Sequence, residues 1–271
     1  MIDNTVLAIE IVTHLLFSAH LNREVTIDCY LPTAKAPAEQ TSLLLFNDGQ
    51  DLRTIHFDQM LQSLYQQKDI EPVVCVAIHC APDRKNEYGT ASVLDYKGRG
   101  AKAGLYQLFV MEELLPFIRK QYALTSCKQK VFAGFSLGGL SALDIVWTHP
   151  TEFSKVGVFS GSFWWRDRDT EDKLFDERTD RIMHRLIRTG QYRPWLQFFF
   201  ESGFLDETAD RNNNGIIDAV DDTRDLIKEL VHKGYDASKD IVSIELKEGK
   251  HDLSTWTTVL PQFMKWAFPS H

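Results

Sequence analysis

The sequence predicts an α/β protein whose central sheet is mostly parallel and covered by helices on both faces. Three observations lead to this prediction. Short apolar segments alternate along the chain with segments of helical period, which is the order of β-α-β units with right-handed crossovers. Some of these segments are apolar on both faces, as is typical of central parallel strands. The 271 residues show no internal repeat or linker, so residues 1–271 are expected to form one domain.

The expected elements follow from the periodicity of each segment. Alternation over residues 25–31 predicts a half-buried strand that is stopped by Pro32. Further apolar segments predict strands at residues 42–46, 73–78, 131–133, 156–159, 196–200 and 241–246. Apolar residues at helical spacing predict helices at residues 57–65, 105–122, 137–147, 223–231 and 254–267, with a polar helical insert near 171–189. Pro116 is expected to perturb its helix or to mark a join within it.

Composition excludes several classes of protein. Lysine and arginine number 30 against 38 aspartate and glutamate, a formal charge of −8, which argues against nucleic acid or an anionic membrane as the main partner. No segment approaches the ~18 consecutive apolar residues of a membrane-spanning helix. Residues 1–5 lack the features of a secretory leader, so a cytoplasmic location is expected unless a leader has been removed. The four cysteines are scattered and are expected to be free thiols.

A candidate nucleophile lies in the motif Gly134-Phe135-Ser136-Leu137-Gly138, which has the pattern G-x-S-x-G. An apolar strand precedes the motif and a helix-forming run follows it. A sharp strand-to-helix turn needs small residues around the serine, because the backbone is crowded there. Such a turn presents Ser136 Oγ at the start of a helix, where developing negative charge is stabilised. The alternative is a glycine-rich turn whose serine only caps the helix.

A nucleophilic serine needs a base and an acid that orients the base. In α/β hydrolases these follow the serine in the order acid, then histidine. His251 lies between the last predicted strand and the last helix, where a base is expected, although a surface histidine without a role is the alternative. The candidates for the acid are Glu201, Asp206 and Asp210. Asp206 is favoured, because Glu201 falls within a strand and Asp210 suits a metal loop.

Acyl transfer also needs two backbone N–H donors for the oxyanion. Leu137, the residue after the nucleophile, is expected to provide one of them. Gln50, in the loop that follows the strand at 42–46, is expected to provide the other, with Gly49 allowing close approach. Asp48 in the same loop is expected to contact the substrate. A plain turn at Asp48-Gly49 is the alternative.

Residues 210–221 follow the spacing of an EF-hand calcium loop. Oxygen-bearing side chains occupy positions 1, 3, 5, 9 and 12, with glycine at position 6 and a hydrophobic residue at position 8. The expected ligands are Asp210, Asn212, Asn214, the carbonyl of Ile216, Asp218 and Asp221. The calcium would be structural, and no cofactor is expected for catalysis. The alternative is an Asn-Gly turn with solvated acids.

Together these motifs resemble the Putative esterase family, and within it the enterochelin-esterase branch. The resemblance runs from about residue 25 to 266 and rests mainly on residues 47–51, 84–88, 113–118, 134–143, 150–165 and 251–256. It implies an α/β-hydrolase fold, a triad of Ser136, Asp206 and His251, and hydrolysis of esters or thioesters. Members act on siderophore trilactones, feruloyl and acetyl esters of plant polysaccharide, S-formylglutathione or mycolyl esters. The chain is expected to lack the additional N-terminal domain of the enterochelin esterases.

The leading hypothesis is a serine carboxylesterase whose partner is a small-molecule or carbohydrate ester. Trp164 and Trp165 follow a strand end, where ligands bind in such sheets, so they are expected either to line an acyl pocket or to be core aromatics. One alternative is a catalytically silent, calcium-stabilised carbohydrate-binding module of the same fold. Another is an acyltransferase, in which an alcohol outcompetes water for the acyl-enzyme.

Overall fold

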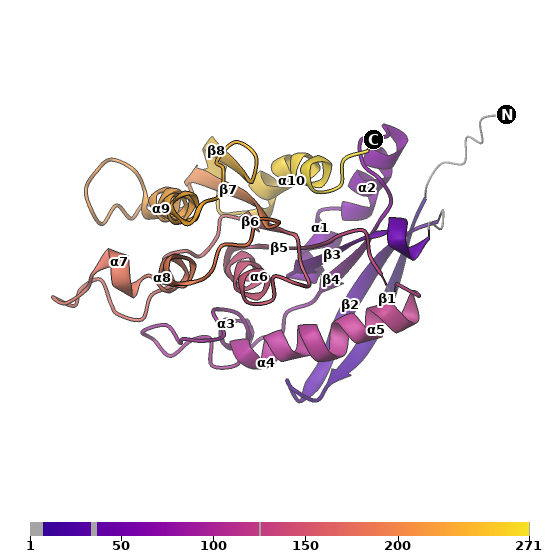
Figure 1. Cartoon of the computed structure of the whole chain (residues 1–271), viewed down its shortest axis with the longest axis horizontal. Coiled ribbons are helices and arrows are strands. Elements are labelled where there is room, and N and C mark those ends of the chain that lie inside the picture. Colours follow the sequence, from indigo (N-terminus) through magenta and orange to yellow (C-terminus); the bar gives the residue numbers. More distant parts are fainter. Residues whose placement is uncertain (1–7, 34–36, 125, 271) are drawn as a thin grey trace.

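The computed structural model describes residues 8–33, 37–124 and 126–270 (Figure 1). Residues 1–5, on which the expectation of a missing leader rests, lie outside these ranges. In the described ranges one sheet has the strand order β1-β2-β4-β3-β5-β6-β7-β8. Its strands are β1 (Ile9–Ser18), β2 (Arg23–Pro32), β3 (Ser42–Asn47), β4 (Val73–Ile78), β5 (Lys130–Phe135), β6 (Lys155–Phe159), β7 (Gln197–Leu205) and β8 (Ile241–Lys250).

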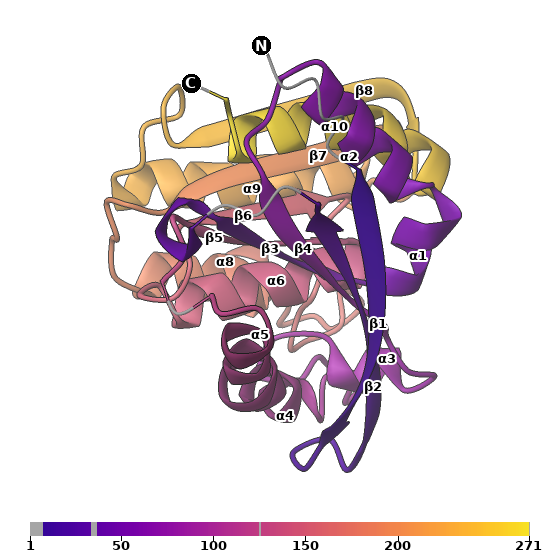
Figure 2. The same ribbon diagram turned by 90° about the vertical axis from the view of Figure 1, so that its right-hand side faces the viewer.

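The sheet is mixed at one edge and parallel elsewhere. β2 runs antiparallel to both β1 and β4, whereas the pairs from β4 through β8 are parallel. The predicted α/β class with a mostly parallel sheet is therefore confirmed. Figure 2 shows that the β1–β2 hairpin extends beyond the rest of the sheet.

Helices cover both faces of the sheet, and each face has its own hydrophobic core. On one face, side chains of α1 (Gly49–Thr54), α2 (Phe57–Gln66) and α10 (Leu253–Ala267) pack together. On the other, α5 (Leu115–Gln121), α6 (Ser136–Thr148), α8 (Ile182–Thr189) and α9 (Asp218–Lys233) pack (Figure 1). Most residues of α6 are buried, from Leu137 to Val146, so this helix lies in the interior. None of the helices in the described ranges is both long and apolar enough to span a membrane.

Several elements differ from the sequence predictions. Strand β1 and the short helices η1 (Ala38–Gln40), α1 and α3 (Arg84–Glu87) were not predicted. The insert is helical only in α7 (Glu177–Asp180) and α8, and α9 begins at Asp218 rather than at residue 223. The helix predicted at 105–122 consists of α4 (Ala103–Leu108), the π-helical segment η2 (Phe109–Leu114) and α5. Pro116 lies in the first turn of α5, where its missing N–H costs least, so the expected join is found directly before it.

Candidate active site

Ser136 lies at the sharp turn between β5 and α6. Its backbone is in the left-handed region, with φ 53°, directly after the extended residue Phe135. The surrounding glycines make the turn possible. A Cβ on Gly134 would lie 2.6 Å from the carbonyl carbon of Gly138, and one on Gly139 would lie 2.7 Å from the carbonyl oxygen of Gly134. The turn thus holds the serine at the carboxyl end of a central strand, as the G-x-S-x-G motif predicts.

His251 lies beside this serine. It follows β8 directly, and its Nε2 is 2.8 Å from Ser136 Oγ. The ring contacts Trp256 edge-on, with centroids 5.1 Å apart, and Trp256 stacks on Phe135 at 4.7 Å. Asp252 caps α10 by accepting a hydrogen bond from the backbone N–H of Thr255. The structure therefore brings together two residues that lie far apart in the sequence, in contact suited to proton transfer.

Asp206 is the carboxylate that the structure places next to His251. It follows the end of β7, and its side chain is 1% exposed. Its Oδ2 lies 4.0 Å from His251 Nδ1, which is an ion-pair distance rather than a hydrogen bond, and accepts a hydrogen bond from the Gly203 N–H at 3.3 Å. Of the other two candidates, Glu201 lies within β7 and Asp210 lies in the loop beyond.

Two glycines allow the loops of Asp206 and His251 to approach. A Cβ on Gly203 would lie 2.4 Å from the carbonyl oxygen of Gly249, and one on Gly249 would lie 2.9 Å from Gly203 Cα. The pairing of β7 with β8 also changes register between Gly203 and Leu205. Sequence reasoning missed the role of this pair, since it depends on a contact between the ends of two strands that lie far apart in the sequence.

The expected oxyanion donors both lie in the first turn of a helix. Leu137 is the second residue of α6 and Gln50 the second residue of α1. Backbone N–H groups at these positions have no partner within the helix and attract negative charge. The side chain of Gln50 is held by Cys80, whose backbone N–H donates to Gln50 Oε1 at 3.2 Å. A Cβ on Gly49 would lie 2.5 Å from the backbone of Ala77, so only glycine allows this loop to lie against β4.

Asp48 has a different role from the expected substrate contact. The residue is 1% exposed, and its two carboxylate oxygens accept hydrogen bonds from Arg84 Nε at 2.7 Å and Nη2 at 2.6 Å. Its backbone N–H donates to the hydroxyl of Tyr88 at 3.1 Å. Asp48 thus fixes the start of the loop that carries Gln50, and the carboxylate that was expected to contact the substrate is already paired with Arg84. The pairing with Arg84 could not be seen from sequence spacing.

Trp164 and Trp165 were expected either to line a pocket or to be core aromatics, and the structure shows one of them in each environment. Trp165 is fully buried and belongs to the core. Trp164 is half-buried and lines a cavity of about 170 Å³ beside Asp206 and His251. The other residues that line this cavity are Ser160, Gly161, Asp206, Glu207, Ala219 and His251. Of the two tryptophans, Trp164 is therefore the one that faces a cavity.

The residues expected to bind calcium fold into a loop in which most of their polar groups converge. Asp221 Oδ2 accepts hydrogen bonds from the side-chain amides of Asn212 and Asn214, at 3.2 and 2.6 Å. Asp210 accepts from the backbone N–H groups of Asn214 and Gly215, and Gly215 has φ 84°. These oxygens suit a hard cation such as calcium. Across the described residues, however, no three histidine, cysteine or acidic side chains are grouped to hold a metal.

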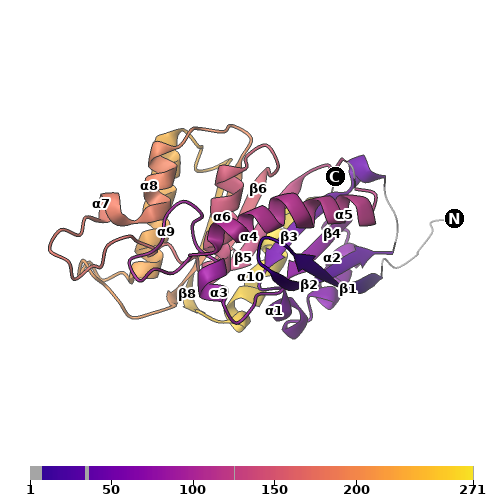
Figure 3. The same cartoon turned by 90° about the horizontal axis from the view of Figure 1, so that it is seen from below.

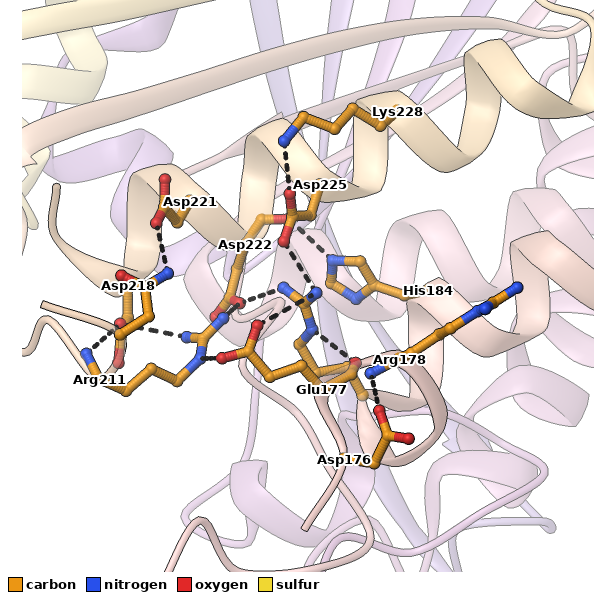
Figure 4. Close-up of polar contacts among 12 residues, drawn as sticks. Asp176, Glu177, Arg178, His184, Arg211, Asp218, Asp221, Asp222, Asp225 and Lys228 are labelled. Atoms are coloured by element: carbon orange, nitrogen blue, oxygen red, sulfur yellow. Dashed lines mark hydrogen bonds and ion pairs between the residues drawn. The ribbon is translucent and has the colours of Figure 1, made fainter. Parts of the chain in front are cut away.

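Two expected ligands of this loop do not converge with the others through their side chains. Asp218 accepts a hydrogen bond from the backbone N–H of Arg211 at 2.9 Å and pairs with its guanidinium at 3.2 Å (Figure 4). Ile216 was expected to contribute only its carbonyl, and its N–H donates to Asn214 Oδ1 at 2.8 Å. The carboxylate of Asp218, at position 9 of the loop, is therefore paired with Arg211 and does not converge with the other expected ligands.

A buried network of charges joins this loop to the helical insert (Figure 4). Arg211 donates to Asp222 at 2.6 Å and to Glu177 of α7 at 2.8 Å, and Arg181 donates to Asp222 at 2.7 Å. Burial, with a smaller contribution from the positive charge of Arg181, lowers the pKa of the neighbouring His184 to about 3. His184 is therefore neutral at physiological pH. Figure 3 shows α7 and its flanking loops at the end of the molecule opposite β1 and α5.

Comparison with solved structures identifies the fold. The chain superimposes on an enterochelin esterase from Shigella flexneri with a TM-score of 0.72 and 21% identity, over 94% of this chain and 57% of that chain. It superimposes on a ferulic acid esterase with a TM-score of 0.70 and 18% identity, over 97% of this chain and 98% of that one. The fold is that of the α/β-hydrolase esterases.

Sequence comparison gives the family. The chain is 24% identical to the iron(III) enterobactin esterase of Escherichia coli K12 over 209 residues, which cover 76% of this chain and 48% of that protein. The chain thus spans about half of that relative. The model of the Putative esterase family matches residues 18–267, so the chain belongs to this family and is a hydrolase that acts on ester bonds.

Proposed function

We propose that the protein is a serine carboxylesterase that forms an acyl-enzyme on Ser136. The observation that carries this proposal is the 2.8 Å contact between Ser136 Oγ and His251 Nε2 at the turn between β5 and α6. A serine in such a turn is exposed to a substrate and close to a base, which together activate the hydroxyl. The buried carboxylate of Asp206 on the far side of His251 supports the same assignment.

The catalytic steps follow from this arrangement. His251 accepts the proton of Ser136 as Oγ attacks the ester carbonyl, and Asp206 stabilises the resulting imidazolium. The N–H groups of Leu137 and Gln50 stabilise the oxyanion. His251 then protonates the departing alcohol. In the second half of the cycle a water molecule, deprotonated by His251, attacks the acyl group and releases the acid.

The cavities beside the triad support a small-molecule or carbohydrate ester as substrate. A second cavity, of about 350 Å³, shares Trp164 and Glu207 with the cavity at His251. Its lining also includes Arg166, Thr170 and Asp210. One aromatic surface among several polar side chains is the combination that orients a ligand rich in hydroxyl groups.

Labelling with a fluorophosphonate tests the proposed activity. The reagent should form a covalent adduct on Ser136, because only a serine activated by a base reacts at a useful rate. Mass spectrometry of the digested protein would locate the adduct. Absence of labelling under conditions that label a known serine esterase would contradict the proposal and would favour a catalytically silent carbohydrate-binding module. If the protein is labelled, adding an alcohol to the ester assay distinguishes an acyltransferase, which transfers the acyl group to the alcohol, from a hydrolase, which transfers it to water.

We propose further that residues 210–221 bind a structural calcium ion. Asp210, Asn212, Asn214, Asp221 and the Ile216 carbonyl would be direct ligands, and Asp218 would act through water, as is frequent at position 9 of EF-hand loops. The ion would hold the segment between Asp206 and α9. It would also neutralise part of the acidic surplus of the chain.

Calcium should therefore raise the melting temperature of chelator-treated protein. Binding at about a hundredfold excess over Kd is expected to raise it by roughly 5–10 °C, because the unfolded chain lacks the site. Calorimetry with and without calcium would measure the shift. Asp210→Ala should abolish the response, whereas Asp236→Ala, in the turn before β8, should retain it. An unchanged melting temperature in the unmodified protein would contradict the calcium site.

A further inference from the structure

Glu201 is a buried carboxyl group that the proposed mechanism does not use. It lies in β7 and is 1% exposed. Its Oε2 accepts a hydrogen bond from Ser160 Oγ at 3.4 Å, while its Oε1 has no hydrogen-bond partner among the described residues. Asp206 is in the same situation, because in the described part of the chain its Oδ1 is buried without a partner. Leaving a buried oxygen without a hydrogen bond costs free energy of folding, so a donor is expected for each of these two oxygens.

The backbone of β7 places these two oxygens in the same region. A Cβ on Gly203 would lie 2.7 Å from Asp206 Oδ1, so this oxygen lies over the face of β7 toward which a side chain at position 203 would point. Glu201 precedes Gly203 by two residues, and the pairing with β8 is regular from Glu201 to Gly203. Side chains two residues apart in a strand share a face. The side chain of Glu201 therefore points into the region that contains Asp206 Oδ1.

The surroundings favour a neutral Glu201. Burial, with the negative charge of Asp206 as the second cause, raises its pKa to about 8. The other titratable groups of this region, Glu207 and His251, lie with Asp206 around the adjoining cavity. Glu207 is itself a carboxyl group and supplies no positive charge, and burial raises its pKa as well. A proton on Glu201 would avoid placing two carboxylates side by side.

We propose that Glu201 is a positioning residue that donates its carboxyl proton from Oε1 to Asp206 Oδ1, so that the two groups share one negative charge. This inference rests on the proposed role of Asp206 in the triad. The O–H···O⁻ bond would satisfy both unpaired oxygens and would hold Oδ2 toward His251 Nδ1. On its other side, Glu201 is held by Ser160, whose Oγ accepts a hydrogen bond from Trp256 Nε1 at 2.8 Å.

Loss of this proton has two expected effects. Above about pH 8 the donor disappears and a second negative charge faces Asp206, so kcat should fall on the alkaline side. Stability should change at lower pH. Between the usual glutamate pKa of 4.5 and about 8, the folded chain keeps a proton that the unfolded chain releases, so stability falls as the pH rises.

Glu201→Gln tests the proposal, because the amide keeps an N–H donor that does not titrate in this range. Near neutral pH its kcat should stay within about threefold of the unmodified value, and the alkaline fall in kcat near pH 8 should disappear. Glu201→Ala should instead lower kcat by about tenfold or more, since the donor is lost. Glu245→Gln, at an exposed position of β8, is the matched control and should keep the original pH profile. An alkaline limb that is unchanged in Glu201→Gln would overturn the proposal.

Infrared spectroscopy provides a readout that does not depend on catalysis. The difference spectrum between the unmodified protein and Glu201→Gln should contain a protonated-carboxyl band that disappears on titration through about pH 8. The difference spectrum with Glu245→Gln should lack it. If the band is present while Ser136 resists the fluorophosphonate, the shared proton stands and the proposed esterase mechanism fails. If the band is absent, the proton is not on Glu201 and the inference is wrong.

Discussion

Replacing Ser136 with alanine should lower kcat/KM for p-nitrophenyl acetate by about 10⁴-fold or more, because the reaction loses its nucleophile and only binding and oxyanion stabilisation remain. The fold should be unaffected. Ser136 already has φ 53°, and alanine carries the same Cβ, so the backbone strain is unchanged. The His251 side chain is 40% exposed, so water can replace the lost hydroxyl. Steady-state kinetics and thermal unfolding would measure the two effects.

Ser154→Ala is a suitable control for that experiment. Ser154 precedes β6 at the opposite end of the sheet, and its hydroxyl donates to the carbonyl of Lys130 at 3.3 Å. The same change of residue type there should leave turnover close to the unmodified value. Turnover by Ser136→Ala at the unmodified rate would show that the ester is hydrolysed elsewhere, and the assignment of the nucleophile would be wrong.

Replacing Asp206 with asparagine should lower kcat by about 10³- to 10⁴-fold, which corresponds to about 4–5.5 kcal/mol in the activation free energy. The amide has nearly the same size as the carboxylate but carries no charge. It therefore cannot stabilise the imidazolium form of His251 and favours the wrong ring tautomer. The 4.0 Å separation of Asp206 Oδ2 and His251 Nδ1 makes this charge the principal contribution of the residue.

The comparison with Asp210→Asn identifies the acid of the triad. Both variants should be assayed at saturating calcium, so that metal binding to residues 210–221 is kept as nearly constant as possible. The loss of kcat should be much greater for Asp206→Asn. A greater loss for Asp210→Asn would show that the acid was assigned to the wrong residue. Asp236→Asn, in an exposed turn, controls for the loss of a carboxylate as such.

Periodicity predicted most of the sheet because the central strands carry a strong signal. β3 and β4 are buried at every position, so a continuous apolar run marks them without ambiguity. β1 escaped prediction for the opposite reason. As an edge strand it has one neighbour, and Leu15 and Phe17 remain 65% and 60% exposed, so its apolar residues do not mark a buried face.

The candidate site was predictable where a local motif fixes the geometry. The G-x-S-x-G turn depends on crowding among neighbouring residues, so it can be read from a few positions. The contacts of Asp48 with Arg84 and of Glu201 with Ser160 depend instead on how segments that are distant in the sequence pack together. The position of Asp48 in the expected oxyanion loop suggested a substrate contact, but only the fold shows that its carboxylate is already paired with Arg84.

The contact between Gly203 and Gly249 restricts how a protein with this site could diversify. The ends of β7 and β8 touch through backbone atoms at these two positions, so neither glycine can gain a side chain without a shift of the other strand. Trp164, in contrast, lines the cavity beside Asp206 and His251. New substrates would therefore be accommodated most readily by substitutions at the half-buried Trp164, while the strand ends before Asp206 and His251 change together.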